Sequence, residues 1–209
     1  MSSTIIPDLS PHFVPLNELP EQLDWREYFG NDQSVELDVG CGRGLFVFRA
    51  SEEHPERNYV GIELDFKKAR RGALRLNKQD RPNGRIWGGD ANLALDKIIR
   101  PHSVAAVHVY FPDPWWKKKH RRRRIFTDEF INRAVRILEH EGYLHFWTDV
   151  EDYWEVAASL MNHDSRFVPR EAPEEQQPEH DMDYQTSFER KKRKIGSTIY
   201  RGLWQLKPV

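Results

Sequence analysis

Short apolar runs alternate with longer amphipathic segments over most of the chain. Apolar runs are typical of strands buried on both faces of a parallel sheet, and the longer segments are typical of helices that cover such a sheet. The strands predicted in this way are 34–39, 58–64, 85–88, 104–111 and 143–147, followed by an antiparallel pair at 166–170 and 198–206. The helices predicted between them are 43–54, 66–79, 91–99, 127–139 and 151–162. This order predicts a three-layer, Rossmann-like α/β domain with a mostly parallel sheet and an antiparallel C-terminal strand.

Local signals set some of the boundaries. Asp90 and Thr127 are predicted N-caps, because such side chains accept hydrogen bonds from the free N–H groups of a first helical turn. Gly142 is predicted to end helix 127–139 before the strand at 143–147 begins. Residues 1–33 are predicted to form a mainly irregular N-terminal extension, with a short helix near 21–29. Residues 34–209 are predicted to form a single domain.

A glycine-rich turn follows the first predicted strand, where Asp38 is succeeded by Gly40, Gly42 and Gly44. Glycines between a strand and a helix let the backbone approach a ligand, as in α/β folds that bind nucleoside-containing cofactors. The dinucleotide fingerprint needs a third glycine three residues after the second, and Leu45 occupies that position. The G-x-G-x-G form with its preceding acidic residue resembles motif I of class I S-adenosylmethionine-dependent methyltransferases. An NAD site and a ligand-free turn are the alternatives.

Acidic side chains stand at the ends of all five predicted parallel strands. In open α/β sheets ligands bind outside the carboxyl ends of the strands. A single such residue is more often a helix cap, but five of them at one edge predict a binding site. A carboxylate after the second strand can accept hydrogen bonds from both hydroxyls of a ribose, and one after the third strand from an adenine amino group. The five residues are Asp38, Glu63, Asp90, Asp113 and Asp149.

Charge is unevenly distributed, although the formal net charge is only −1. Seven of the eight residues at 117–124 and all five at 190–194 are Lys or Arg, whereas 171–179 is acidic and contains prolines. Such segregation focuses a positive potential on one face and favours nucleic-acid binding. We expect residues 117–124 to meet nucleic-acid phosphates, with the strong salt dependence that such contacts bring. The segment at 171–183 is predicted to be a mobile loop.

The sequence FPDPW at 111–115, followed by Lys117, Lys118 and the arginine run, resembles the tRNA (guanine-N7)-methyltransferase family. Thr186 and Glu189 are similar to that family's T-x-x-E signature, and the resemblance covers about residues 34–206. Two positions depart from the family pattern. Trp116 stands where a second proline is usual, and Asp38 replaces a common glutamate.

The resemblance implies methyl transfer from S-adenosylmethionine to N7 of a guanine in the variable loop of tRNA, with Asp113 catalytically important. Because guanine N7 carries no proton, the reaction needs correct placement and charge stabilisation rather than a general base. The cofactor contacts implied are Asp38, Gly40, Gly42, Glu63, Asp90, Asn92 and Asp113. The RNA contacts implied are Lys117, Asp149, Thr186 and Glu189.

Other features of the sequence bear on location, metal binding and partners. No apolar run reaches the ~18 residues of a membrane span, and we expect no signal peptide. The single cysteine, Cys41, excludes an internal disulfide and fits a reducing, cytoplasmic compartment. It lies inside the glycine turn with no obvious base, so it is interpreted as a small turn residue rather than a nucleophile. The histidines are scattered, and His108 is interpreted as a core residue, so no metal is expected. The family implies a monomer or homodimer with no obligate protein partner.

Two other functions remain open at this point. A non-catalytic RNA-binding protein could keep the basic segments beside a decayed cofactor site, and binding of the methyl donor would exclude it. A methyltransferase acting on a small molecule or a protein is the second alternative. Competition by RNA would separate it from an RNA-modifying enzyme.

Overall fold

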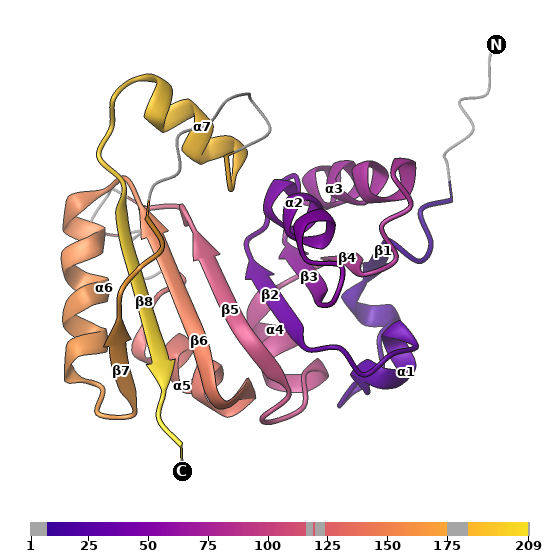
Figure 1. Cartoon of the computed structure of the whole chain (residues 1–209), viewed down its shortest axis with the longest axis horizontal. Helices are drawn as coiled ribbons and strands as arrows, with labels where there is room; N and C mark the ends of the chain where they lie inside the picture. Colours follow the sequence, from indigo (N-terminus) through magenta and orange to yellow (C-terminus); the bar gives the residue numbers. More distant parts are fainter. Residues whose placement is uncertain (1–7, 116–118, 120–123, 175–183, 209) are drawn as a thin grey trace.

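The computed structural model describes residues 8–115, 119, 124–174 and 184–208. Within these residues, eight strands form one sheet in the order β1-β4-β3-β2-β5-β6-β8-β7 (Figure 1). Pairing is parallel from β1 to β6, and β8 runs antiparallel to both β6 and β7. This arrangement confirms the mostly parallel sheet with an antiparallel C-terminal strand. The strands are β1 Phe13–Pro15, β2 Val35–Val39, β3 Asn58–Glu63, β4 Gly84–Gly88, β5 Val104–Tyr110, β6 Leu138–Thr148, β7 Phe167–Arg170 and β8 Tyr200–Leu206.

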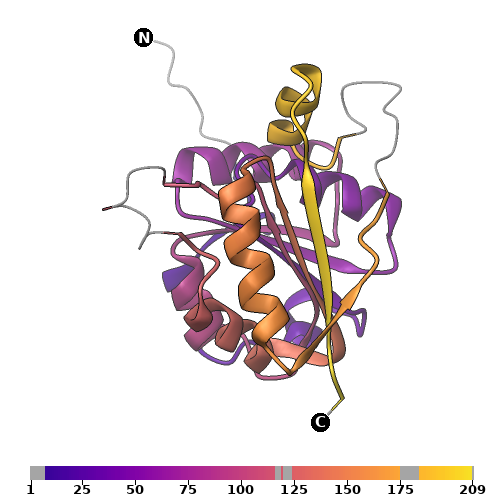
Figure 2. The ribbon, with the colours of Figure 1, turned by 90° about the vertical axis from the view of Figure 1, so that its left-hand side faces the viewer.

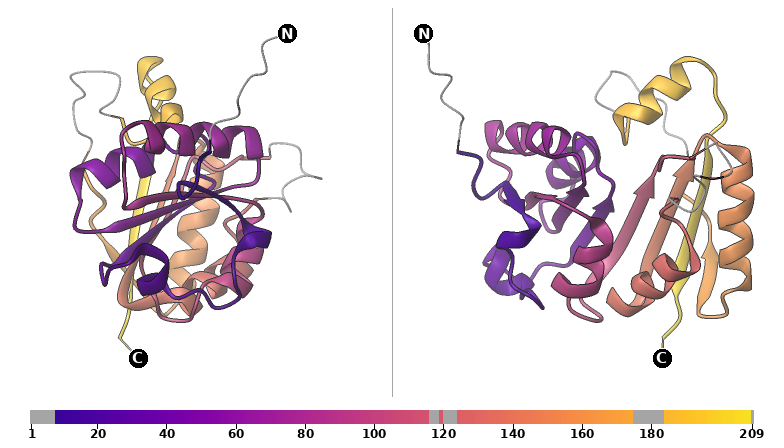
Figure 3. Two further views of the ribbon diagram at one scale, coloured as in Figure 1. Left: turned by 90° about the vertical axis from the view of Figure 1, so that its right-hand side faces the viewer. Right: turned by 180° about the vertical axis from the view of Figure 1, so that it is seen from behind.

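Helices cover both faces of the sheet (Figures 2 and 3). One face packs against α2 Leu45–Glu53 and α3 Phe66–Lys78. The other packs against α4 Ala91–Leu93 and its π-helical continuation η2 Ala94–Ile98, α5 Asp128–Ile137 and α6 Glu151–His163. The remaining elements are η1 Leu16–Glu18, α1 Trp25–Phe29 and α7 Ser187–Lys194. None of the helices in the described residues is long and apolar enough to cross a membrane.

The alternation of side chains along β2 explains the two faces. Val35, Leu37 and Val39 point into the larger core beneath α5 and α6. Glu36 and Asp38 point to the opposite face, because successive side chains of a strand alternate. The face that carries α2 therefore carries the acidic residues of β2 as well.

Two predicted helix caps are confirmed. The Asp90 carboxylate accepts a hydrogen bond from the backbone N–H of Asn92 at 2.9 Å, and α4 follows directly. The Thr127 hydroxyl accepts one from the N–H of Phe130 at 3.3 Å at the start of α5. Each side chain satisfies a donor that the first turn of a helix leaves free.

Gly142 does not end α5 as predicted. The helix ends at Ile137, and Gly142 lies inside β6, where the pairing with β5 shifts register. A Cβ atom on Gly142 would lie 3.0 Å from the carbonyl oxygen of Glu139 and 3.1 Å from that of Ala105. The glycine therefore permits a close approach of backbones at this irregularity.

The segment predicted to be mainly irregular contributes to the sheet. Strand β1 pairs in parallel with β4 at its edge, and α1 lies within the short helix predicted near 21–29. Leu16 and Leu23 are buried in the larger core, and the Trp25 ring stacks on that of Trp87 at 5.6 Å between centroids. The division of the chain at residue 34 stays a prediction.

Candidate active site

The glycine turn between β2 and α2 has a backbone that favours glycine. Gly40, Gly42 and Gly44 have φ angles of 82°, 58° and 62°. A Cβ atom added to Gly40 or Gly42 would meet no atom within 4 Å, whereas one on Gly44 would lie 3.0 Å from the Ile86 side chain. Gly44 thus allows α2 to pack closely. Gly40 and Gly42 leave bare backbone beside open space, which suits the approach of a cofactor.

Glu63, at the end of β3, holds this turn in place. One of its carboxylate oxygens accepts a hydrogen bond from the N–H of Gly42 at 2.9 Å, and the other accepts from the N–H of Asp65 at 2.9 Å. Each oxygen keeps capacity for a further bond, since a carboxylate has about four acceptor positions. The structure thus brings Glu63 to the glycine turn, and the group remains chemically able to accept from a ribose.

Asp38 lies beneath the turn, with only 3% of its surface exposed. Burial, followed by the nearby charge of Glu63, raises the pKa of the Asp38 carboxyl to about 8. Both causes disfavour the charged form of the carboxyl. A cationic ligand would reverse that balance.

Asp90 and Asn92 lie past the end of β4, which pairs with β3. Asp90 is exposed and caps α4, so its position is set by the helix start. The structure thus places Asp38, Glu63 and Asp90 at the carboxyl ends of three consecutive strands of the sheet, as the sequence predicts.

The loop after β5 carries Asp113, whose side chain is exposed. Two non-glycine residues of this loop adopt the left-handed region, Phe111 with φ 50° and Trp115 with φ 45°. The N–H of Phe111 donates to the carbonyl of Trp147 at 2.8 Å, which ties the start of the loop to β6. At the other end, Arg124 donates from Nε to the carbonyl of Pro114 at 2.7 Å.

The expectation that every basic residue of 117–124 contacts phosphates is wrong for Arg124. This residue was placed with the phosphate-binding residues at 117–124, but only 8% of its surface is exposed. A run of like charges cannot show by itself which member turns inward. Lys119 is exposed, whereas Lys117 and Trp116 lie outside the described residues.

Thr186 and Glu189 form a reciprocal cap at the start of α7. The Thr186 hydroxyl accepts from the N–H of Glu189 at 2.9 Å, and the Glu189 carboxylate accepts from the N–H of Gln185 at 2.8 Å. Glu189 is 3% exposed, and Arg193 and Arg201 lie 3.4 and 3.7 Å from one of its oxygens. Helix α7 was missed from the sequence, although S/T-x-x-E/Q is the signature of a capping box.

Helix α7 lies over the carboxyl ends of β5 and β6 (Figure 1). Lys192 forms an ion pair with Asp149 at 2.7 Å, and the rings of Phe188 and Phe111 lie 5.4 Å apart. The structure therefore brings Asp149 together with α7 and the loop of Asp113. Sequence reasoning missed Lys192 as the partner of Asp149. The predicted mobile loop falls mainly on 175–183, outside the described residues.

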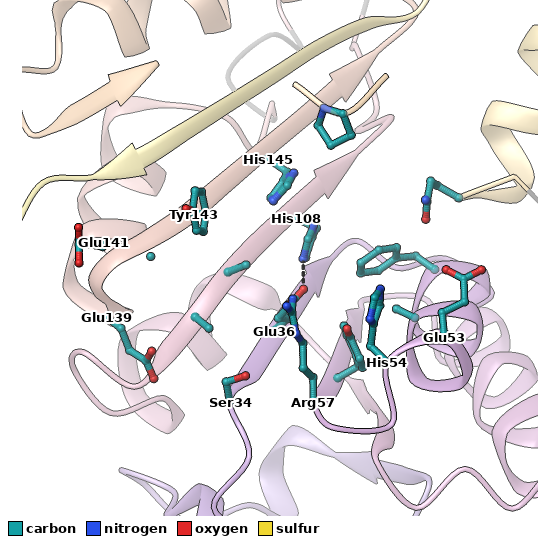
Figure 4. Close-up of a pocket in the computed structure, with 18 of the residues that line it drawn as sticks. Ser34, Glu36, Glu53, His54, Arg57, His108, Glu139, Glu141, Tyr143 and His145 are labelled. Carbon is teal, nitrogen blue, oxygen red and sulfur yellow. Dashed lines mark hydrogen bonds and ion pairs between the residues drawn. The ribbon is translucent and has the colours of Figure 1, made fainter. Parts of the chain in front are cut away.

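A separate hollow of about 550 Å³ lies on the α2 face, toward the starts of β2 and β5 (Figure 4). His108 Nε2 lies 2.8 Å from Glu36, and its Nδ1 lies 2.9 Å from the Tyr110 hydroxyl. Burial alone would raise the pKa of Glu36, but hydrogen bonds from His108 and Arg57 outweigh it and lower the pKa to about 2. The interpretation of His108 as a satisfied core residue is confirmed. The glycine turn does not line this hollow.

The sheet order, the glycine turn at its centre and the acidic carboxyl ends define a class I methyltransferase fold. The crystal structure of the 16S rRNA methyltransferase KamB has the same fold, with a TM-score of 0.63 at 16% identity, over 90% of this chain and 95% of that one. Residues 32–202 match the model of a family described as "Putative methyltransferase".

Similarity in sequence narrows the class to one family. A tRNA (guanine-N(7)-)-methyltransferase of Rhodopirellula baltica is 42% identical over 200 residues, covering 93% of this chain and 74% of that protein. An enzyme of the same name from Syntrophotalea carbinolica is 33% identical over 162 residues, covering 78% and 70%. The chain belongs to the tRNA (guanine-N(7)-)-methyltransferase family.

Proposed function

We propose that this protein transfers a methyl group from S-adenosylmethionine to N7 of a guanine in the variable loop of tRNA. The observation that carries the proposal is the meeting of the glycine turn, the acidic strand ends and the Asp113 loop at one edge of the sheet. Family membership supports the enzyme class, the cofactor and the tRNA substrate.

The residues of the turn and strand ends fit this cofactor. Bare backbone at Gly40 and Gly42 admits its nucleoside, and Glu63 keeps acceptor capacity for the ribose hydroxyls. Asp90 and Asn92 would lie beside the adenine, and buried Asp38 would face the donor's positive charge. When bound, the cofactor supplies an electrophilic methyl group on a positively charged sulfur.

The residues of the substrate side orient the guanine. Asp113 would accept hydrogen bonds from the donor edge of the base, with Asp149 and Thr186 on the same side and Lys117 for the RNA backbone. Glu189, which is buried, would contribute by holding the start of α7 in place. Because N7 carries no proton, these residues need to hold the base in line and stabilise the positive charge that it gains. The base would leave its stacked position to reach them.

The first test is methyl transfer to an unmodified tRNA transcript, with the product nucleoside identified by mass spectrometry. Asp113→Ala is expected to abolish transfer while tRNA affinity stays within about twofold, because Asp113 is one exposed contact among many. Near-normal turnover of this variant would overturn the catalytic role. Methylation at another base would overturn the assignment of guanine N7.

We further propose that the enzyme acts in the cytoplasm as a monomer or homodimer without an obligate protein partner. The absence of a membrane-crossing helix among the described residues is compatible with this. Activity of the purified chain alone would support it, and activity that needs an added cell fraction would contradict it.

A further inference from the structure

Arg124 closes the basic stretch at 117–124, yet its side chain is only 6% exposed. Burying a guanidinium costs free energy unless the group is paired and hydrogen-bonded. The contacts that Arg124 makes therefore indicate what the side chain does. Lys119, from the same stretch, is exposed and provides a direct comparison.

The contacts of Arg124 join the Asp113 loop to α6. Nε donates to the carbonyl of Pro114 at 2.7 Å, and a terminal nitrogen lies 3.6 Å from the carboxylate of Asp152. The guanidinium carbon lies 4.4 Å from the centroid of the Tyr153 ring, which is fully buried. The Tyr153 hydroxyl in turn accepts from the N–H of Phe126 at 3.2 Å. Arg124 thus lies between the buried Tyr153 ring and the backbone of the loop.

The loop needs such support. The left-handed conformations of Phe111 and Trp115 cost about 1–3 kcal/mol each and persist only where the surroundings enforce them. The bond from Phe111 to Trp147 fixes the start of the loop, and the bond from Arg124 fixes Pro114, next to Trp115. Asp113 lies between these two fixed points.

We infer that Arg124 is a positioning residue for Asp113 and is not an RNA contact. It holds the carbonyl of Pro114, and thereby the carboxylate one residue earlier, at the place where the guanine is oriented. This inference rests on the proposed role of Asp113 in the transfer. The catalytic loop is then built partly from the basic stretch itself.

The test compares Arg124→Met with Lys119→Met, since each removes one positive charge from the same stretch. Arg124→Met is expected to lower kcat about 10–100-fold, because a displacement of about 1 Å at a reacting group has effects of this size. Its tRNA dissociation constant and salt slope should match those of the wild type. Lys119→Met should instead weaken tRNA binding and reduce the salt slope by about one.

Three further measurements do not depend on turnover. S-adenosylmethionine affinity and thermal unfolding show whether Arg124→Met is folded. Hydrogen exchange of a peptide covering 108–115 should be faster in Arg124→Met than in Lys119→Met, without any tRNA present. Arg124→Lys should recover part of the loss, since it keeps a charge but cannot make the same set of contacts.

Different outcomes separate this inference from the proposed function. A shallower salt slope with normal kcat in Arg124→Met would overturn the positioning role, and so would unchanged loop exchange. If the wild type forms no 7-methylguanosine, the proposed function fails even where loop exchange supports Arg124. The double variant Asp113→Asn/Arg124→Met should lose less activity, in free-energy terms, than the sum of the losses in the two single variants, because both changes act through one carboxylate. Additive losses would contradict the coupling.

Discussion

Asp38 and Glu36 lie two residues apart on β2 and face the same side of the sheet, yet their carboxyls titrate in opposite directions. Burial acts on both. Glu36 receives hydrogen bonds from His108 and Arg57, which lower its pKa to about 2. Asp38 is raised to about 8 by burial and by Glu63. The difference arises because Glu36 adjoins His108 and the Arg57 guanidinium, whereas the charge that acts on Asp38 is the like charge of Glu63. In the proposed cofactor site, the donor would bring a positive charge to Asp38.

We therefore predict that S-adenosylmethionine affinity depends on the ionisation of Asp38. Because the pKa of Asp38 is about 8 and the donor binds its charged form, the affinity should rise about tenfold for each unit that the pH increases toward 8, and should level off above that value. The measurement is calorimetric titration between about pH 6 and pH 9. Asp38→Asn serves as the control, since it retains the donor's own titration but removes that of the carboxyl. Equal profiles for the two proteins would contradict the prediction.

The same shift affects stability. A folded-state pKa raised from 3.8 to about 8 means that the contribution of Asp38 is fully present below pH 3.8 and is lost as the pH rises through about 8. Asp38→Asn should accordingly remove a decline in the stability of the free protein over that window. Such a trade of stability for binding is common at functional sites.

At the scale of elements, periodicity predicts the buried strands and helices of the sheet well, because side-chain alternation and burial follow from local sequence. Helix α7 could not be predicted in this way, because its sequence SFERKKRK has almost no apolar residues to show a helical period. Only the capping box at its start indicates a helix. Gly142 was misinterpreted because a glycine can end a helix or permit a close backbone approach. Only the neighbouring strand decides between the two.

The pairing of β2 with β5 leads to a prediction at this scale. Glu36→Gln removes the charge that His108 and Arg57 bind, and should cost about 1.5–3 kcal/mol at neutral pH. A folded pKa of about 2, against 4.5 ordinarily, means that this stability is present above pH 4.5 and is lost as the pH falls toward 2. Urea unfolding at several pH values should show a shallower acid dependence for the variant. Exposed Glu141→Gln is the control, expected within about 0.5 kcal/mol of the wild type.

At the scale of the whole molecule, the candidate site was predictable where it follows from topology. Parallel strands bring their carboxyl ends to one edge, so Asp38, Glu63 and Asp90 could be grouped without coordinates. The contacts of Arg124 with Asp152 and of Lys192 with Asp149 could not, because each joins segments far apart in the chain. The pairing of β1 with β4 could not be predicted either, because a strand of three residues is too short to show the alternation of apolar and polar side chains.

The last prediction concerns the N-terminal segment. The sequence predicts that residues 1–33 form a separate extension, yet Leu16 and Leu23 are buried in the larger core. Leu23 is 5% exposed, and its N–H donates to the carbonyl of Ile98 at 2.7 Å. Leu23→Ala should cost about 2–5 kcal/mol of global unfolding free energy, since it leaves a cavity in the larger core. Leu64→Ala, at a site 70% exposed, should change it by no more than about 0.5 kcal/mol.

Urea unfolding followed by both circular dichroism and tryptophan fluorescence distinguishes the two possible architectures. If residues 8–33 fold with the rest, Leu23→Ala shifts one cooperative transition to lower urea with an unchanged slope, and both probes coincide. If they form a separable extension, the main transition stays in place and only a minor early change appears. Trp25 and Trp87, two of the seven tryptophans, stack across this boundary. Loss of their contact before the core unfolds should therefore add an early component to the fluorescence transition that circular dichroism follows less strongly.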